Sequence, residues 1–140
     1  NDRDSAEGII ESRESMHPSY QMYFLEEFVQ RPPRDIRAIV IGDNVSAAIY
    51  RNTDGVNWKT NTHLGGSVET CEVSNELEDI CIKAKNVVQG EIVGVDLMES
   101  NDKGLVVHEI NNTTEFRNVV RVTDIDIPTQ MLDYAKNSVK

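Results

Sequence analysis

The chain has 140 residues, of which 24 are acidic and 14 are basic, and its formal net charge is -10 at pH 7. This length is enough for one compact domain with its own core and too short for two. So acidic a chain argues against a nucleic-acid partner, because the phosphate backbone demands a basic surface.

The apolar runs and the cysteines point to the same compartment. Every apolar run is strand-sized and broken by charged residues, so we expect no membrane span and no membrane partner. Cys71 and Cys81 belong to no CxxC or Cys/His cluster, which argues against a disulfide framework and a zinc site. The sequence therefore predicts a cytoplasmic protein with reduced thiols.

The first part of the chain predicts a charged helix, a β-prone segment and a β-hairpin. They span residues 1–16, 23–29 and 36–51, with the hairpin turn at 42–44. A proline follows the helix and two prolines follow the β-prone segment, so each element is expected to stop there. The first hairpin strand is apolar on both faces, which is typical of a central strand covered on both sides.

The middle of the chain predicts a long loop and an amphipathic helix. Residues 52–66 are polar, and a loop of this length inside a compact domain is usually functional or disordered. After a short strand, Ser74 can cap a helix that closes at Gly90. The apolar residues of this helix follow the 3.6-residue period: Leu77, Ile80, Cys81, Ala84, Val87 and Val88.

The last part of the chain predicts a second hairpin and a final helix. Residues 92–100 and 105–111 are strand-like and separated by a four-residue turn. A polar loop is expected over 113–126, and Pro128 then starts a helix. The residues of this helix that are expected to point inward are Met131, Leu132 and Ala135. Together the elements predict an α+β fold with a mainly antiparallel sheet and flanking helices.

Three polar side chains are expected on one face of the second hairpin. If Ser100 pairs with Leu105, Asp96 lies opposite Glu109, and side-chain alternation keeps Asn111 on the same face. Two carboxylates about 5 Å apart repel by about 3 kcal/mol at an effective dielectric of about 20, unless a positive group lies between them. Carboxylates with an amide oxygen, without thiolate or imidazole, are a ligand set of Mg²⁺, which then usually also holds phosphate.

A solvated face of an antiparallel sheet is the alternative for these carboxylates. The register decides between the two, because a one-residue slip sends either side chain to the opposite face. Basic residues nevertheless gather in the first third of the chain and again after the second hairpin, where they could receive an anionic ligand. They are Arg31, Arg34, Arg37, Arg51, Arg117 and Arg121.

Six segments, taken in order, resemble the C-terminal half of ATP-grasp ligases. They are Phe-Leu-Glu-Glu-Phe-Val at 24–29, Arg-Asp-Ile-Arg at 34–37, Ala-Ala-Ile-Tyr-Arg at 47–51, Asn61 with Gly65-Gly66, Gly-Val-Asp-Leu at 94–97 and Glu-Ile-Asn at 109–111. Each is a weak motif alone, and their order and spacing carry the resemblance. It is closest to the ligases that join 2-aminoadipate or glutamate to an amino-group carrier protein in lysine and arginine biosynthesis, which are relatives of RimK.

The resemblance implies an ATP-grasp subdomain with ATP and Mg²⁺ as cofactors. It places the Mg²⁺ ligands at Asp96, Glu109 and Asn111. It places the adenine hinge at Glu26, Glu27, Phe28 and Val29, and the phosphate contacts at Arg37, Arg51 and Asn61, with Arg51 as the catalytic residue. A buried strand is the alternative for the hinge. For Arg37 the alternatives are a substrate carboxylate and a salt bridge.

The resemblance also implies a site for the amino-acid substrate. Its expected contacts are Thr62, His63, Glu115, Phe116, Arg117, Asn118 and Val119, with Arg117 or Arg121 available to the carboxylates. A solvated loop histidine is the alternative for His63. Aminoadipate-type enzymes are expected to carry Asn followed by Thr or Ala here, and glutamate-type enzymes Gly-Phe. Asn118-Val119 therefore favours 2-aminoadipate and leaves glutamate open.

The implied reaction is ATP-dependent amide synthesis through an acyl phosphate on the carrier protein. The N-terminal domain and the phosphate-binding lysines of such ligases precede the part that this chain resembles, so we expect the isolated chain to be inactive. A RimK-like or arginine-branch glutamate ligase and a non-catalytic binding module are the competing interpretations. A homo-oligomer is among the assemblies left open.

Overall fold

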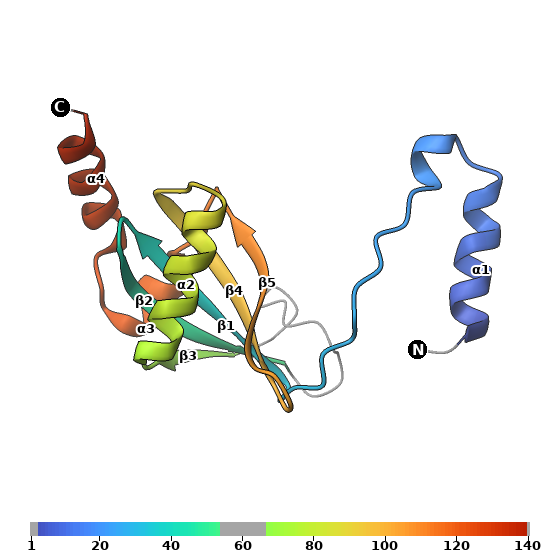
Figure 1. Cartoon of the computed structure of the whole chain (residues 1–140), viewed down its shortest axis with the longest axis horizontal. Helices are drawn as coiled ribbons and strands as arrows, with labels where there is room; N and C mark the ends of the chain where they lie inside the picture. The colour runs from blue at the N-terminus through green and yellow to red at the C-terminus, as the bar shows by residue number, and fades with distance from the viewer. Residues whose placement is uncertain (1–2, 54–66, 140) are drawn as a thin grey trace.

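The computed structural model describes residues 3–53 and 67–139, which form a five-stranded antiparallel sheet with helices on both faces (Figure 1). The strands are β1 (Arg34–Ile41), β2 (Asn44–Asn52), β3 (Val68–Cys71), β4 (Ile92–Ser100) and β5 (Gly104–Asn111), in the spatial order β3-β2-β1-β4-β5. The helices are α1 (Arg3–Glu14), the short 3₁₀ turn η1 (Pro18–Tyr20), α2 (Asn75–Val87), α3 (Arg117–Thr123) and α4 (Ile127–Ser138). This architecture confirms the predicted α+β fold. Among the described helices, none is long and apolar enough to cross a membrane.

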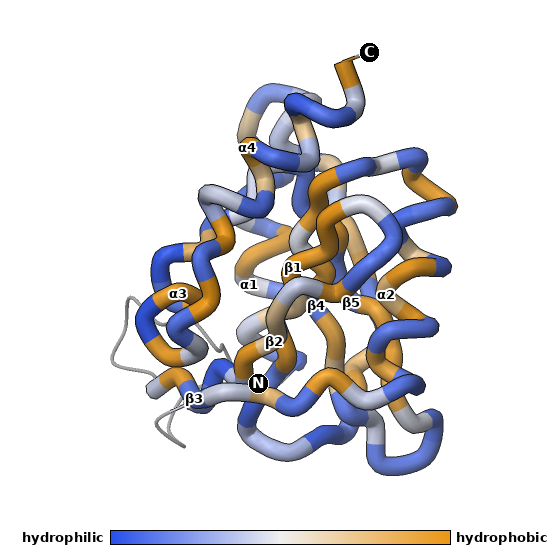
Figure 2. The backbone as a smooth tube through the Cα atoms, turned by 90° about the vertical axis from the view of Figure 1, so that its left-hand side faces the viewer, coloured by the Kyte–Doolittle hydropathy of each residue, from blue (hydrophilic) through white to orange (hydrophobic). Residues whose placement is uncertain are grey.

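The central position of β1 follows from its two apolar faces. Its even-numbered residues pack beneath α2, where Leu77 is buried. The odd-numbered Ile39 and Ile41 pack on the opposite face, against Val119 of α3 and Ile127 of α4. Hydrophobic residues accordingly gather along the strands of the sheet (Figure 2). The sheet therefore has an apolar core on each face, one beneath α2 and one beneath α3 and α4, as the two apolar faces of this strand predict.

The helix α3 corrects the predicted loop over 113–126. Its sequence, Arg-Asn-Val-Val-Arg-Val-Thr, is rich in β-branched residues and has low intrinsic helix propensity. Val119 is 1% exposed and packs against the sheet, and such tertiary packing contributes more to most helices than propensity does. The local sequence therefore gave the wrong prediction, because the stabilising contacts come from distant strands.

The helix α4 is present as predicted, but its inward face is different. Ile127 is fully buried, and Met131 and Tyr134 pack against the same apolar cluster. Leu132 is 60% exposed and Ala135 is exposed, so neither belongs to the core as predicted. The buried stripe has the spacing i, i+4, i+7, which starts one turn earlier than the sequence analysis placed it.

The β-prone segment over 23–29 forms an extended arm instead of the predicted strand. Phe24 is 86% exposed and Leu25 is 90% exposed. Within the described residues, no strand pairs with this segment. A strand needs a neighbour that completes its backbone hydrogen bonds, and β propensity alone does not supply one. The arm carries η1 and α1 away from the sheet (Figure 1).

A β-bulge sets the register of the β4–β5 hairpin. Near the turn Ser100 pairs with Gly104, not with Leu105 as predicted. The register then shifts, so that Leu97 faces Val107 while its neighbour Asp96 faces Glu109. The extra residue in β5 restores the pairing that was predicted for the two carboxylates. Without this extra residue, side-chain alternation from Gly104 onward would place Glu109 on the face opposite to Asp96.

Both cysteines are buried free thiols, as expected for reduced cysteines. Burial raises the pKa of the Cys81 thiol to about 12, and burial also raises the pKa of Cys71. Because the thiolate is the reactive form, we expect neither thiol of the folded chain to react with Ellman's reagent at about pH 8. Both should react after unfolding in urea. Fast reaction of either thiol in the folded chain would contradict this prediction.

Candidate functional site

Three neighbouring strands bring the predicted cation ligands to one face of the sheet. Arg37 of β1 pairs across to Asp96 of β4, and Asp96 pairs across to Glu109 of β5. Asn111, two residues further along β5, lies opposite Gly94. Residues directly opposite in an antiparallel pair share a face, and alternation keeps residues two apart on that face. The arrangement therefore groups these side chains on the face that also carries α3 and α4.

Two arginines neutralise the buried Asp96 carboxylate. Asp96 is 4% exposed, and Arg37 donates to both of its oxygens, through Nε to Oδ1 and through Nη2 to Oδ2 at 2.8 Å. Nη2 of Arg51 lies 3.0 Å from the same Oδ2. The positive charge expected beside Asp96 and Glu109 is therefore supplied here by the protein. The salt-bridge alternative for Arg37 describes this arrangement.

A second carboxylate holds the other end of Arg51. Its Nε donates to Oδ1 of Asp35 at 2.6 Å, and Asp35 is only 6% exposed. Burial lowers the pKa of Arg51, but the hydrogen bond to Asp35 and the attraction of both carboxylates outweigh it, so this pKa is raised above its usual value. Arg51 is therefore a fixed cation between two acids. The sequence analysis missed Asp35, although strand alternation places it on the face of Arg37.

The residues around Asp96 fit a divalent cation. Asn111 Nδ2 is buried and has no hydrogen-bond partner among the described residues. Turning this carboxamide over would present Oδ1 in its place, an acceptor suited to a hard cation. Within residues 3–53 and 67–139 no group of three or more His, Cys, Asp or Glu could hold a metal ion. A cation beside Asp96 and Glu109 would therefore need the amide oxygen of Asn111 as a further ligand.

Gly94 leaves room for two side chains of the site. A Cβ at this position would lie 3.0 Å from Oγ1 of Thr114 and 3.6 Å from Cδ of Arg37. We expect Gly94→Val to lower the free energy of unfolding by about 1–2 kcal/mol, because the branched side chain overpacks this place. Urea denaturation followed by circular dichroism measures it. Gly8→Ala, where nothing lies within 4 Å, is the control and should not destabilise; equal stability of both variants would contradict the prediction.

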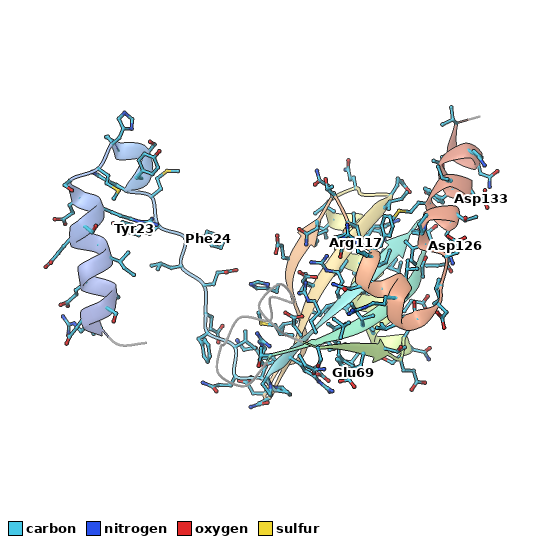
Figure 3. The ribbon with its side chains drawn as sticks, turned by 180° about the vertical axis from the view of Figure 1, so that it is seen from behind. Tyr23, Phe24, Glu69, Arg117, Asp126 and Asp133 are labelled. Atoms are coloured by element: carbon cyan, nitrogen blue, oxygen red, sulfur yellow. The ribbon has the colours of Figure 1, made fainter. Side chains whose placement is uncertain are left out.

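The predicted adenine hinge lies beside the β4–β5 hairpin. Asn101 N donates to Gln30 O at 2.9 Å, Lys103 Nζ lies 2.7 Å from a carboxylate oxygen of Glu27, and His108 Nε2 lies 3.8 Å from Glu26. The arm and the hairpin turn enclose a cavity of about 400 Å³. It is lined by Glu27, Phe28, Val29, Gln30, Ser100, Asn101, Asp102 and Lys103. Tyr23 and Phe24 lie further out on the arm (Figure 3).

The predicted substrate segment forms the start of α3. Glu115 Oε1 accepts a hydrogen bond from Arg117 N at 2.8 Å, and Phe116 packs against the apolar cluster. The Arg117 side chain is exposed on α3 (Figure 3), whereas the Val119 side chain belongs to the core. Val119 is therefore placed as a packing residue. The predicted contacts Asn61, Thr62 and His63 lie outside the residues that the structure describes.

Comparison with known proteins places this arrangement in a family. A family model described as RimK-like ATP-grasp domain matches residues 1–135. The alpha-aminoadipate--LysW ligase LysX of Sulfurisphaera tokodaii is 33% identical over 140 residues, which are 99% of this chain and 49% of that protein. The tetrahydromethanopterin:alpha-L-glutamate ligase of Methanocaldococcus jannaschii is 41% identical over 124 residues, 86% of this chain and 42% of that protein.

A solved structure agrees with the fold. The RimK domain ATP-grasp protein of Sphaerobacter thermophilus superposes with a TM-score of 0.66 at 17% identity, over 96% of this chain and 44% of that one. At this identity the likeness concerns the fold alone. The chain spans about half the length of the curated relatives that it matches. It belongs to the RimK-like ATP-grasp domain family.

Proposed function

We propose that this chain is the C-terminal half of an ATP-dependent carboxylate-amine ligase. The ligase joins the α-amino group of 2-aminoadipate to the side-chain carboxylate of the C-terminal glutamate of a small amino-group carrier protein, in lysine biosynthesis. The observation that carries this proposal is the buried Asp96, which faces Glu109 and is neutralised by two arginines. The similarity to a LysX ligase over nearly the whole chain supports it.

The site would hold Mg²⁺ and the phosphates of ATP. Asp96, Glu109 and Asn111 would bind Mg²⁺, which when bound neutralises phosphate charge. Arg51 and Arg37 would then offer their guanidinium groups to the phosphate oxygens, since arginine binds phosphate through charged forks of donors. Adenine would enter at residues 26–29, where the cavity beside the β4–β5 hairpin lies next to the strands of the site.

The reaction has two balanced steps. A carboxylate oxygen of the carrier's terminal glutamate attacks the γ-phosphorus of ATP, ADP leaves, and an acyl phosphate forms. The amino group of 2-aminoadipate then attacks the acyl carbon, inorganic phosphate leaves, and the nitrogen loses a proton. The contribution of this chain is positioning and charge stabilisation, the terms on which phosphoryl transfer chiefly depends. No side chain serves as a covalent nucleophile.

The amino-acid substrate would bind at the start of α3. Arg117 and Arg121 are exposed there and could receive its carboxylates. Glutamate is the second candidate substrate, and the glutamate ligase from Methanocaldococcus jannaschii at 41% identity favours it. Comparing the consumption of 2-aminoadipate and glutamate at equal concentration decides between them. Because Asn118-Val119 keeps the Asn expected of aminoadipate-type enzymes, we expect 2-aminoadipate to be consumed faster.

The isolated chain is expected to show no measurable ligase turnover, because the resemblance to ATP-grasp ligases implies that the phosphate-binding lysines come from an N-terminal half that this chain does not span. A coupled assay of ADP release, with carrier protein, amino acid and Mg²⁺, measures this. The complete ligase, in which that half precedes this chain, is the positive control. Full ligase rates from the isolated chain would contradict the prediction.

A non-catalytic binding module is the competing class of function. In that case the complete protein would release no ADP, Mg²⁺ and ATP would not raise its melting temperature, and Asp96→Ala with Glu109→Ala would leave its function intact. A ligand that binds the folded state stabilises it by mass action. A rise in melting temperature that Asp96→Ala abolishes therefore supports the ligase.

A further inference from the structure

We propose that Asp35 is a positioning residue that keeps Arg51 on the site face when the Asp96 carboxylate turns to its cation. Asp35 would contact neither the cation nor the substrate and would act through Arg51. This inference rests on the proposed function, because it concerns the moment at which Mg²⁺ and ATP enter the site.

The geometry shows Arg51 as a bridge between two buried carboxylates. Asp35 lies directly opposite Arg51 in the β1–β2 register, so the two side chains share a face. Arg51 uses Nε for Asp35, at 2.6 Å, and Nη2 for Asp96, at 3.0 Å. Its guanidinium therefore has one anchor that belongs to the cation site and one that does not.

Arg37 has no such second anchor within the part of the chain that the structure describes. Both of its described hydrogen-bonding nitrogens, Nε and Nη2, point to Asp96, and among the described residues it has no other carboxylate partner. If both oxygens of Asp96 turned to a cation, Arg37 would lose both hydrogen bonds and Arg51 would lose one contact. Arg37 is therefore the arginine that is released, and Arg51 is the one that stays in place.

Loss of the Asp35 charge would turn Arg51 into a competitor of the cation. In Asp35→Asn, Arg51 keeps one of the two carboxylates that it contacts among the described residues, and that carboxylate is Asp96. Arg51 would then follow Asp96, and Mg²⁺ would have to displace two arginines for which Asp96 is the carboxylate partner among the described residues. A merely structural role of Asp35 would lower turnover by the same factor at every Mg²⁺ concentration.

The first test is a titration of the complete ligase with Mg²⁺ at saturating ATP, carrier and amino acid. A hydrogen bond to a charged group contributes enough that Asp35→Asn should raise the half-saturating Mg²⁺ concentration about ten-fold or more. Asp35→Glu keeps the charge and should restore most of the wild-type value. The matched control is Glu99→Gln, which removes the charge and one of the two acceptor oxygens of the Arg34–Glu99 pair on the other face of the sheet and should leave the titration unchanged.

The second test does not depend on turnover. The arginine Nε–H signals of the complete ligase are followed by NMR while Mg²⁺ and ADP are added, with Arg37→Lys and Arg51→Lys to assign them. The Arg37 signal should shift, because its Nε–H leaves Asp96, and the Arg51 signal should keep its position, because its Nε–H stays on Asp35. Equal responses of both signals would overturn the inference, and this comparison decides the matter if Asp35→Asn does not fold.

Failure of the inference and failure of the proposed function look different. If Asp96→Ala abolishes ADP release while Asp35→Asn has the wild-type Mg²⁺ titration, Asp35 is not a positioning residue and the ligase function stands. If the complete wild-type protein releases no ADP with either amino acid, the proposed function fails and the inference falls with it.

Discussion

Replacing Asp96 with alanine is expected to lower the free energy of unfolding of this chain by about 2–3 kcal/mol and to abolish Mg²⁺-dependent ADP release by the complete ligase. The stability loss follows because the side chains of Arg37 and Arg51, 14% and 18% exposed, would keep their charge without this carboxylate. The effect falls below that of a fully buried pair because water still reaches both arginines and Arg51 keeps Asp35. Urea denaturation of the isolated chain measures the first effect.

Glu109→Ala separates the structural role of Asp96 from its catalytic one. The Glu109 side chain is exposed and makes no hydrogen bond or ion pair with any residue that the structure describes. Its removal should therefore change stability by less than about 0.5 kcal/mol, as surface substitutions usually do. ADP release should still be lost, because Glu109 would supply an oxygen of the proposed cation site. Full activity of Glu109→Ala would contradict the proposed ligand set.

The face shared by Asp96 and Glu109 could be predicted, but the path of the chain that creates it could not. Alternation along β4 and β5 gave the correct pairing from an incorrect starting point at the turn. The bulge compensates for that error, and no residue type within 105–111 indicates from the sequence that a bulge is present. Its position depends on the need of Leu105 and Ile110, five residues apart, to pack against the same apolar cluster.

Long-range contacts explain the other differences between sequence and structure. The aromatic arm over 23–29 has the composition of a strand, but composition does not say whether a partner strand is available. The helix α3 has the composition of a loop or strand, but Val119 finds a buried place against β1 and β2. In both cases the deciding factor is whether a distant part of the chain offers a packing or pairing partner, and periodicity and propensity give no information about that.

The source of positive charge at the site could be predicted only in outline. A positive group near Asp96 was predicted from the repulsion between the two carboxylates. For Arg37, both a phosphate contact and a salt bridge were among the predicted roles. The structure shows both arginines on Asp96, and this arrangement is compatible with a later transfer to phosphate. Asp35 was missed because a single acidic residue within an apolar strand carries no signal until its neighbour across the sheet is known.

Arg51→Lys is expected to reduce kcat of the complete ligase by a factor on the order of 10³, a loss typical of an arginine that stabilises a transferring phosphoryl group. Lysine keeps the charge but presents one ammonium group, which cannot hold Asp35 through one nitrogen while offering others to phosphate. Steady-state ADP release at saturating ATP and Mg²⁺ measures kcat. The KM for ATP should change much less, because the lost interaction is strongest when charge develops on the phosphoryl oxygens.

Arg37→Lys provides the matched comparison for Arg51→Lys. Arg37 contacts the same carboxylate but lacks a bond to Asp35, so its place after cation binding is not fixed by the protein. We therefore expect a smaller loss in kcat for Arg37→Lys than for Arg51→Lys, although both variants keep the net charge. Equal losses in both would mean that the two arginines act as one unit at Asp96. A larger loss for Arg37→Lys would reverse their assignment and make Arg37 the residue that contacts the transferring phosphoryl group.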